Sequence, residues 1–202
     1  MKRPSITRLL ELQKLLVNFR GIKRVVHVPG PEHEWENDVD HSYSLAMLAW
    51  FLSESFPELD RDVVIRIALA HDIVEVHAGD TFLYGDKKLL ATKKQREADG
   101  VKQLEKEWAD FPDMLASIQA YEAKSSPEAK FVSALDKILP ILMIYLNEGY
   151  TWKSKKITLA MLHAKKSEAT APSPQIKKYY NELYALLQQK PHFFPPAPSQ
   201  QM

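Results

Sequence analysis

The sequence predicts an all-α fold, built as a single helical bundle. Three observations favour it: apolar residues recur at helical spacing in successive segments, capping residues precede these segments, and no segment alternates as a convincing strand would. The chain has 202 residues, of which 45% are hydrophobic, so it can bury one sizeable core. No shift in composition divides it. We therefore expect one domain over residues 1–190 and a proline-rich tail over 191–202 that is extended or disordered.

The first helix is expected from Ile6 to Phe19, with Ser5 as its N-cap and Gly21 just beyond its end. Apolar residues form a stripe along this helix, and the stripe either packs on the central helices or supplies a two-fold interface. The stripe consists of Leu9, Leu12, Leu16 and Phe19, widened by Leu10 and Val17.

A polar loop and a second helix come next. The loop, residues 22–39, breaks the periodicity and leaves room for at most one short strand at residues 23–28. The second helix begins near Asp38 or Asp40, either of which can act as its N-cap, and its first turn contains His41. The side chains expected to face inwards are Leu45, Leu48, Ala49 and Leu52.

A buried central helix is predicted to begin behind Asp60 and to end at Gly79. Its core face consists of Ile65, Leu69, Ile73 and Val76. His71 and Asp72 are adjacent on this helix and Glu75 lies one turn later, so the three side chains can converge at one edge of it. Since an isolated carboxylate is costly in an apolar interior, a divalent cation is a natural partner for this group.

Further helices are expected at residues 93–108, on the surface, and at 112–123, 127–146, 151–166 and 176–187. The helix that begins at Pro127 behind the cap Ser126 is the most apolar in the chain, and it contains Asp136. Pro140 cannot donate to the carbonyl of Asp136, so we expect a kink between them. A buried carboxylate at a kink indicates either a site or an Asp paired with Lys137 or a nearby tyrosine.

Composition narrows the classes of function. Lysine and arginine number 27 against 26 aspartates and glutamates, so no overall charge draws a nucleic acid polymer or an acidic membrane surface. The chain has no cysteine, which leaves histidine and carboxylate as its strong metal donors. The N-terminus lacks the apolar run of a secretory signal, and no apolar stretch reaches the roughly 18 residues of a membrane span. We expect a cytoplasmic protein.

Two imidazoles and two carboxylates from three separate helices make up a candidate metal site: His41, His71, Asp72 and Asp136. This set suits one divalent ion such as Zn, Mn, Co, Ni or Mg, and no thiolate selects among them. Four protein ligands on an octahedral ion leave positions for water and a substrate oxygen, as a catalytic site requires. Taken alone, a His-Asp pair on a helix such as His71-Asp72 is more often a hydrogen-bonded structural pair.

The order of these residues resembles the H…HD…D signature of the HD-domain metal-dependent phosphohydrolases. Residues 36–41, Glu-Asn-Asp-Val-Asp-His, and residues 71–80, His-Asp-Ile-Val-Glu-Val-His-Ala-Gly-Asp, are similar to the motifs of the branch that contains the 5'-deoxynucleotidases. The resemblance implies an HD-domain helical bundle, usually dimeric, with His41, His71, Asp72 and Asp136 as ligands of one divalent ion. It also implies hydrolysis of a phosphomonoester, most closely a (deoxy)nucleoside 5'-monophosphate.

The resemblance also suggests roles around the metal. Glu75 would orient the attacking water or exchange its proton, and Asp80 would protonate the leaving alkoxide or bind a sugar hydroxyl. Arg24 is the best-placed match to the phosphate-binding arginine of the branch, or it is a solvated surface charge. The branch places Trp beside that arginine, whereas Val25 follows Arg24 here, so the preference for deoxyribose stays open.

The alternatives differ in substrate and in class. An HD-type hydrolase of another nucleotide or phosphate ester keeps the same metal site. A non-catalytic nucleotide-binding or metal-binding module keeps the fold alone, and a helical interaction protein would use the acidic residues only as ion pairs. Of these, a phosphomonoesterase acting on a small nucleotide, working as a homodimer, is the reading that the motifs favour.

Overall fold

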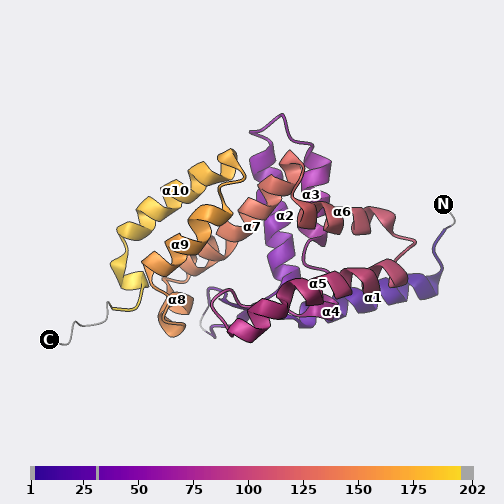
Figure 1. Cartoon of the computed structure of the whole chain (residues 1–202), viewed down its shortest axis with the longest axis horizontal. Coiled ribbons are helices and arrows are strands. Elements are labelled where there is room, and N and C mark those ends of the chain that lie inside the picture. The colour runs from indigo at the N-terminus through magenta and orange to yellow at the C-terminus, as the bar shows by residue number, and fades with distance from the viewer. Residues whose placement is uncertain (1–2, 31, 197–202) are drawn as a thin grey trace.

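The computed structural model describes residues 3–30 and 32–196 and is mostly helical within them (Figure 1). The long helices are α1 Ile6–Gly21, α2 Asp38–Ser53, α3 Arg61–Ala70, α5 Lys87–Glu107, α6 Pro112–Ala123, α7 Pro127–Leu146, α9 Leu159–Ala169 and α10 Pro174–Gln188. The short elements are β1 Lys23–His27, β2 Trp35–Asn37, α4 Glu75–Ala78, α8 Tyr150–Ser154 and the 3-10 turn η1 Pro191–Phe193. The predicted all-α class is confirmed.

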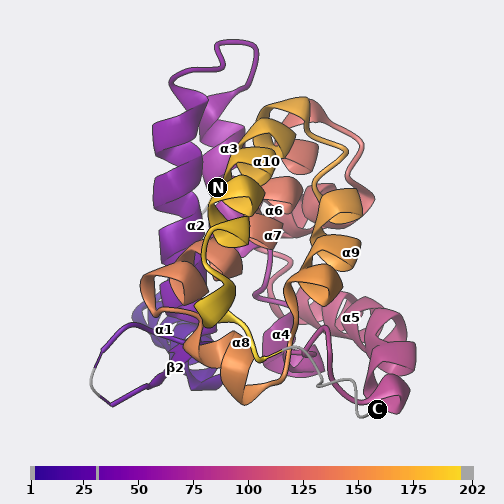
Figure 2. The ribbon, with the colours of Figure 1, turned by 90° about the vertical axis from the view of Figure 1, so that its left-hand side faces the viewer.

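Helix α7 is the central element of the fold. It contacts α2, α3 and α6 on one side, and α9 and α10 lie together on its other side (Figures 1 and 2). Because it is enclosed in this way, α7 buries residues all round its circumference, including Phe131, Leu135 and Ile141. A second apolar cluster lies between α1, α5 and α6, where Phe19, Leu104 and Ile118 meet. The candidate site lies between these two clusters.

Several helix starts follow the predicted capping chemistry. Ser5, Asp60 and Ser126 accept backbone N–H groups at the first turns of α1, α3 and α7, and Pro127 occupies the first helical position of α7. At α2 the cap is Asn37, whose side chain accepts from the amides of residues 39 and 40, so the prediction of an aspartate cap was wrong. Helix α7 continues through Pro140 as far as Leu146.

The predicted central helix is shorter than expected. Helix α3 ends at Ala70, and residues 71–74 form turns before the single turn of α4. Four backbone amides there bond to carbonyls three residues back, so the chain is wound more tightly than in an α-helix; they belong to Ile73, Glu75, Val76 and His77. The core face also differs, because Val64, Ile67 and Ala68 are buried while Leu69 is 47% exposed.

Two predicted irregular segments are ordered. Strands β1 and β2 form an antiparallel hairpin, with Lys23 paired to Asn37, where at most one strand was expected. Helix α5 begins at Lys87, behind the cap Asp86, and not at residue 93.

The C-terminal segment folds onto the core as far as the structure describes it. The expected extended tail was wrong for residues 191–194, because Phe193 and Phe194 are buried, the latter stacked on Trp152. Residues 197–202 of that predicted tail lie outside the described part of the chain.

The first helix buries less than its stripe predicted. Leu15 and Phe19 are buried, whereas four stripe residues are 39–64% exposed: Leu9, Leu10, Leu16 and Val17. In the described part of the chain, no helix combines the length and apolarity that crossing a membrane requires.

Candidate metal centre and active site

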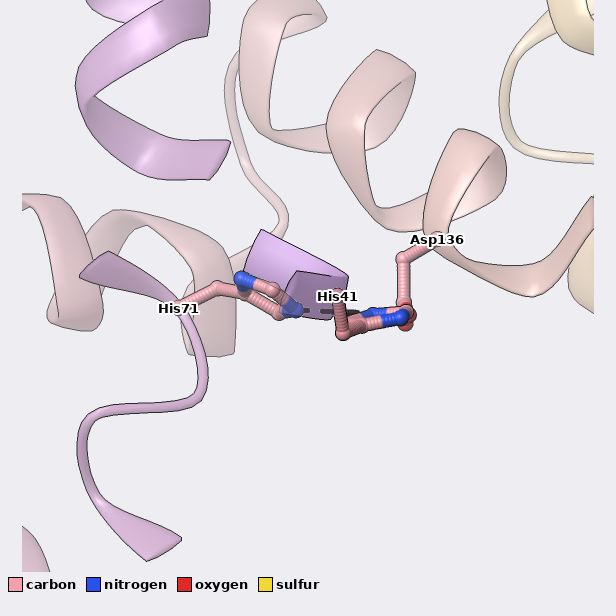
Figure 3. A group of neighbouring side chains, drawn as sticks. All are labelled: His41, His71 and Asp136. Atoms are coloured by element: carbon pink, nitrogen blue, oxygen red, sulfur yellow. Dashed lines mark hydrogen bonds and ion pairs between the residues drawn. The ribbon is translucent and has the colours of Figure 1, made fainter. Parts of the chain in front are cut away.

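The four side chains predicted as metal ligands meet at one point in the protein interior. His41 comes from the first turn of α2, His71 and Asp72 follow the end of α3, and Asp136 comes from the middle of α7. The Nε2 atom of His41 lies 3.0 Å from Oδ1 of Asp136, and Nε2 of His71 lies 4.0 Å from that oxygen (Figure 3). Oδ2 of Asp72 is 3.1 Å from Nε2 of His71 and 3.9 Å from Nε2 of His41.

The tautomer of His71 can be assigned from its partners. Its Nδ1 lies 2.9 Å from the carbonyl oxygen of Ala68, which only accepts, so Nδ1 carries the proton. Nε2 then presents a lone pair. This atom is buried and makes no hydrogen bond within the described part of the chain. A buried acceptor of this kind, facing two carboxylates and a second imidazole, fits a metal ligand.

Asp136 is held in its charged form by its neighbours. Burial raises the pKa of its carboxyl, but the ammonium of Lys137 and the hydrogen bond with His41 outweigh burial and hold the pKa well below its usual range. Oδ2 accepts from the hydroxyl of Tyr121 at 2.7 Å and from Nζ of Lys137 at 2.5 Å. With Oδ2 occupied in this way, Oδ1 remains for the shared site. The sequence left two alternatives for Asp136, a site residue or a carboxylate paired with Lys137 or a tyrosine. Both apply, because Asp136 is paired with Lys137 and Tyr121 and is also part of the cluster.

Glu36 lies behind His41 and was given no role from the sequence. Its side chain is completely buried, and its Oε2 is 3.5 Å from Nδ1 of His41 and 3.3 Å from Nε of Arg24. A carboxylate on the far nitrogen of a histidine fixes the ring orientation and directs the other nitrogen towards a metal. The only available signal was its place in the first motif, five residues before His41.

A second acidic group adjoins the first. Oxygen atoms of Asp38, Asp72 and Glu75 lie within 4.8 Å of one another. Burial, followed by the charges of Asp72 and Asp38, raises the pKa of Glu75 to about 10. Burial likewise raises the pKa of Asp38 to about 6, although Arg24 opposes the shift. Glu75 therefore holds a proton among these carboxylates, and the charge of a bound cation would lower its pKa.

Arg24 is not a solvated surface charge, so that alternative was wrong. Its guanidinium is largely buried, and Nη1 donates to Oδ2 of Asp72 at 2.6 Å and to Oδ1 of Asp38 at 3.1 Å. Burial alone would lower the pKa of Arg24, but the surrounding carboxylates, led by Asp72 and Asp136, raise it. Arg24 neutralises part of the acidic cluster, and its predicted contact with phosphate stays a prediction.

The cluster opens into a cavity of about 320 Å³, at the small end of the range of roughly 300–1,000 Å³ for ligand pockets. The polar end of the cavity includes Arg24, Asp72, Glu75 and Asp80, and its walls include Phe82, Tyr84, Ile141 and Trp152. Burial raises the pKa of Asp80, with Arg24 opposing the shift. All three residues predicted to act on substrate therefore line one cavity.

The donor set fits a divalent cation. Ligand atoms of His41, His71 and Asp136 lie within 4.8 Å of one another, and Asp72 lies within 4.0 Å of both imidazoles. Nitrogen and carboxylate donors with no thiolate suit zinc, manganese, cobalt, nickel or magnesium. His77, by contrast, faces Glu107 at 3.1 Å near the surface and lies outside this group.

The fold and the site together define the class of this protein. It is an all-helical protein with a candidate metal centre beside a cavity. A family model described as HD domain matches residues 17–177, and the chain belongs to this family. The predicted resemblance is thereby confirmed.

Similar proteins carry related names. The chain is 29% identical to 5'-deoxynucleotidase HDDC2 of Homo sapiens and 32% identical to that of Bos taurus. Each match covers 136 residues, which are 66% of this chain and 65% of the relative, slightly under two thirds of the relative's length.

Solved structures share the fold. One, described as a predicted metal-dependent phosphohydrolase from Magnetospirillum magnetotacticum MS-1, is 29% identical, has a TM-score of 0.76 and covers 94% of this chain and 96% of that one. An HD-domain phosphohydrolase from Listeria innocua, 19% identical with a TM-score of 0.55, covers 90% of this chain and 86% of that one. This second likeness supports the fold alone.

Proposed function

We propose that the protein is a metal-dependent phosphohydrolase that removes phosphate from a small phosphomonoester, most specifically a (deoxy)nucleoside 5'-monophosphate. The observation that carries the proposal is the meeting of His41, His71, Asp72 and Asp136 beside a cavity that the last three residues line. The names of the HDDC2 relatives support the nucleotide as substrate.

The four clustered side chains would hold one divalent ion, with Mn, Co, Mg, Zn and Ni as candidates. A bound ion would polarise the phosphate ester and make water acidic enough to attack near neutral pH. Tyr121 fixes the orientation of Asp136 by a hydrogen bond. The carboxylate of Glu36, 3.5 Å from Nδ1 of His41, favours the ring orientation that directs Nε2 into the cluster, so little reorganisation is needed during the reaction.

Glu75 would exchange a proton with the attacking water, and Asp80 would give a proton to the leaving group. Glu75 lines the cavity next to Asp72 and can orient the attacking water and take its proton once its own pKa is lowered by nearby positive charge. Asp80 has a raised pKa, which suits a carboxylic acid that donates a proton to the leaving alkoxide. A hydrogen bond from Asp80 to a sugar hydroxyl is the alternative role.

The rest of the cavity suits a nucleoside. Phe82 offers an apolar face, and the hydroxyl of Tyr84 is buried without a partner among the described residues, so it is available to a sugar or base. Trp35, the first tryptophan after Arg24 in the sequence, stacks on His27 and does not line this cavity, so recognition of deoxyribose would depend on other residues.

The proposal is tested by phosphate release from ribonucleoside and deoxyribonucleoside 5'-monophosphates, triphosphates and simple phosphate esters, with added Mn, Co or Mg. We expect release from 5'-monophosphates that depends on the metal and stops with a chelator. If another phosphate ester is hydrolysed faster, the proposed metal site stands and the proposed substrate is wrong. Tight nucleotide binding without any release would favour a non-catalytic module.

We also propose that the protein acts as a homodimer in the cytoplasm. Support for the dimer comes from exposed apolar side chains on two adjoining helices: Leu10 and Val17 on α1, and Tyr43, Met47, Trp50 and Phe51 on α2. Patches of this kind on a soluble surface commonly mark an interface.

A further inference from the structure

Lys166 is a buried cation that the proposed mechanism leaves unused. It lies on α9, four residues after the buried Leu162, and is only 9% exposed. Its side chain lines the same cavity as Asp72 and Asp136. Within the described part of the chain, no carboxylate lies within 4.0 Å of its ammonium and no acceptor takes a hydrogen bond from it.

This arrangement is costly for the free protein. Burial, with the positive charges of Lys137 and Arg24, lowers the pKa of Lys166 to about 7, and Asp136 opposes this shift. Arg24, whose side chain is 13% exposed, differs because Asp72, Asp38 and Glu36 surround it. An ammonium at the end of a largely buried side chain, without its own counterion, is destabilising. Since this side chain lines the cavity, the ammonium is available to an anion that is supplied from outside the chain.

The neighbours of Lys166 indicate the kind of anion. Lys137 lines the same cavity and already shares its charge with Asp136 at 2.5 Å. Two ammonium groups and one carboxylate leave a net positive charge on the α7 and α9 side of the cavity. An anion with two negative charges and several acceptor oxygens, such as a phosphoryl group, would neutralise this side and satisfy the donors of Lys166.

We propose that Lys166 binds a nonbridging oxygen of the substrate's phosphoryl group, and that Arg24 instead serves mainly as the counterion of the acidic cluster. The proposal rests on the proposed phosphohydrolase function and specifies which cation contacts the phosphate directly. Lys166 is a substrate-binding residue in this scheme and takes no part in proton transfer.

The test compares Lys166→Met, which keeps the length and removes the charge, with Lys166→Arg, which keeps the charge. Lys165→Met is the matched control, because Lys165 is the exposed neighbour on the same helix. Calorimetric titration with inorganic phosphate, on metal-free and Mn-loaded protein, gives Kd without depending on turnover. Steady-state kinetics on a nucleoside monophosphate give KM and kcat, and thermal melting reports on folding.

We expect Lys166→Met to weaken phosphate binding by about 10- to 100-fold, the loss of one charge-assisted hydrogen bond. KM should rise more than kcat falls, and Lys166→Arg should recover most of the affinity. The melting temperature of Lys166→Met should equal or exceed that of the wild type, since a buried unpaired charge has been removed. A purely structural lysine would instead lower it.

A phosphate Kd for Lys166→Met within twofold of that for Lys165→Met would overturn the proposal even if the wild type hydrolyses nucleotides. If the wild type releases no phosphate from any ester, the proposed function fails, while the phosphate Kd values still decide the role of Lys166. Lys166→Gln replaces the methionine variant if that variant does not fold.

Discussion

Glu75 is buried and lies at the edge of the candidate metal cluster. Its proposed role, proton exchange with the attacking water, can be tested by substitution. Replacing Glu75 by Ala should lower kcat by about 10²- to 10⁴-fold, because the carboxyl that exchanges a proton with the attacking water is lost. The metal content of purified protein should be unchanged. Both quantities are measured on the same preparation, by initial rates and by elemental analysis.

The Glu75→Ala experiment has a second possible outcome, because Glu75 belongs to a second acidic group. Asp38, Asp72 and Glu75 are close enough to bind an ion themselves. Loss of metal from Glu75→Ala would therefore reassign Glu75 as a ligand. Glu97→Ala is the control, since Glu97 also lines the cavity but is paired with Lys93 at 2.9 Å; this variant should keep most of its activity and all of its metal.

Individual residues of the site differed in how far the sequence predicted them. The sequence predicted three of them from local spacing alone: His71, Asp72 and Glu75. His41 and Asp136 required the gapped motif, and the structure brings them to the same point. Lys166 was missed because a lysine on a basic helix is ordinarily solvated, and only the packing of α9 against α7 buries it.

At the scale of elements, Gly149 connects α7 to the C-terminal segment. It caps α8 with a φ of 74°, in the left-handed region, and an added Cβ would overlap the backbone of Phe193. Gly149→Ala should reduce the free energy of unfolding by roughly 2–4 kcal/mol, through backbone strain and displacement of Phe193. Denaturant unfolding measures this change.

Gly21→Ala is the matched control for Gly149→Ala. Gly21 ends α1, and an added methyl group there meets no atom within 4 Å. Its effect should be neutral or stabilising by up to about 1 kcal/mol, because alanine favours the helix. Equal stability of the two variants would contradict the packing of Phe193 on Gly149.

The boundaries of elements were predictable where local chemistry sets them. The caps at Ser5, Asp60 and Ser126 depend on one side chain and the next turn, and all three were confirmed. The end of α3 was not predictable, because residues 71–78 continue an apolar pattern typical of a helix, whereas the backbone there forms turns closed by bonds to carbonyls three residues back. Composition alone likewise failed at Phe193 and Phe194, whose burial depends on distant partners.

At the scale of the whole molecule, the exposed apolar face of α1 and α2 makes the proposed dimer testable. Light scattering on a sizing column should give twice the chain mass for the wild type. Phe51→Glu, at a side chain that is 71% exposed, should shift the mass to that of a monomer, because it would bury a charge in the interface. Leu186→Glu, on the distant helix α10, is the control and should leave the dimer intact (Figure 1).

A monomeric wild type would show that this face serves another purpose or none. The site itself would be unaffected, since every described cluster residue comes from the same chain. The helical class was predictable at this scale because periodicity and composition are global properties of the sequence, whereas the placement of α9 and α10 beside α7 depends on long-range packing.

The account depends on one shared cation between α2, α3 and α7. Anomalous diffraction from a crystal soaked in Mn²⁺ tests this most directly. We predict a single peak within bonding distance of Nε2 of His41, Nε2 of His71 and carboxylate oxygens of Asp72 and Asp136. No peak at that point, or a peak only among Asp38, Asp72 and Glu75, would contradict it.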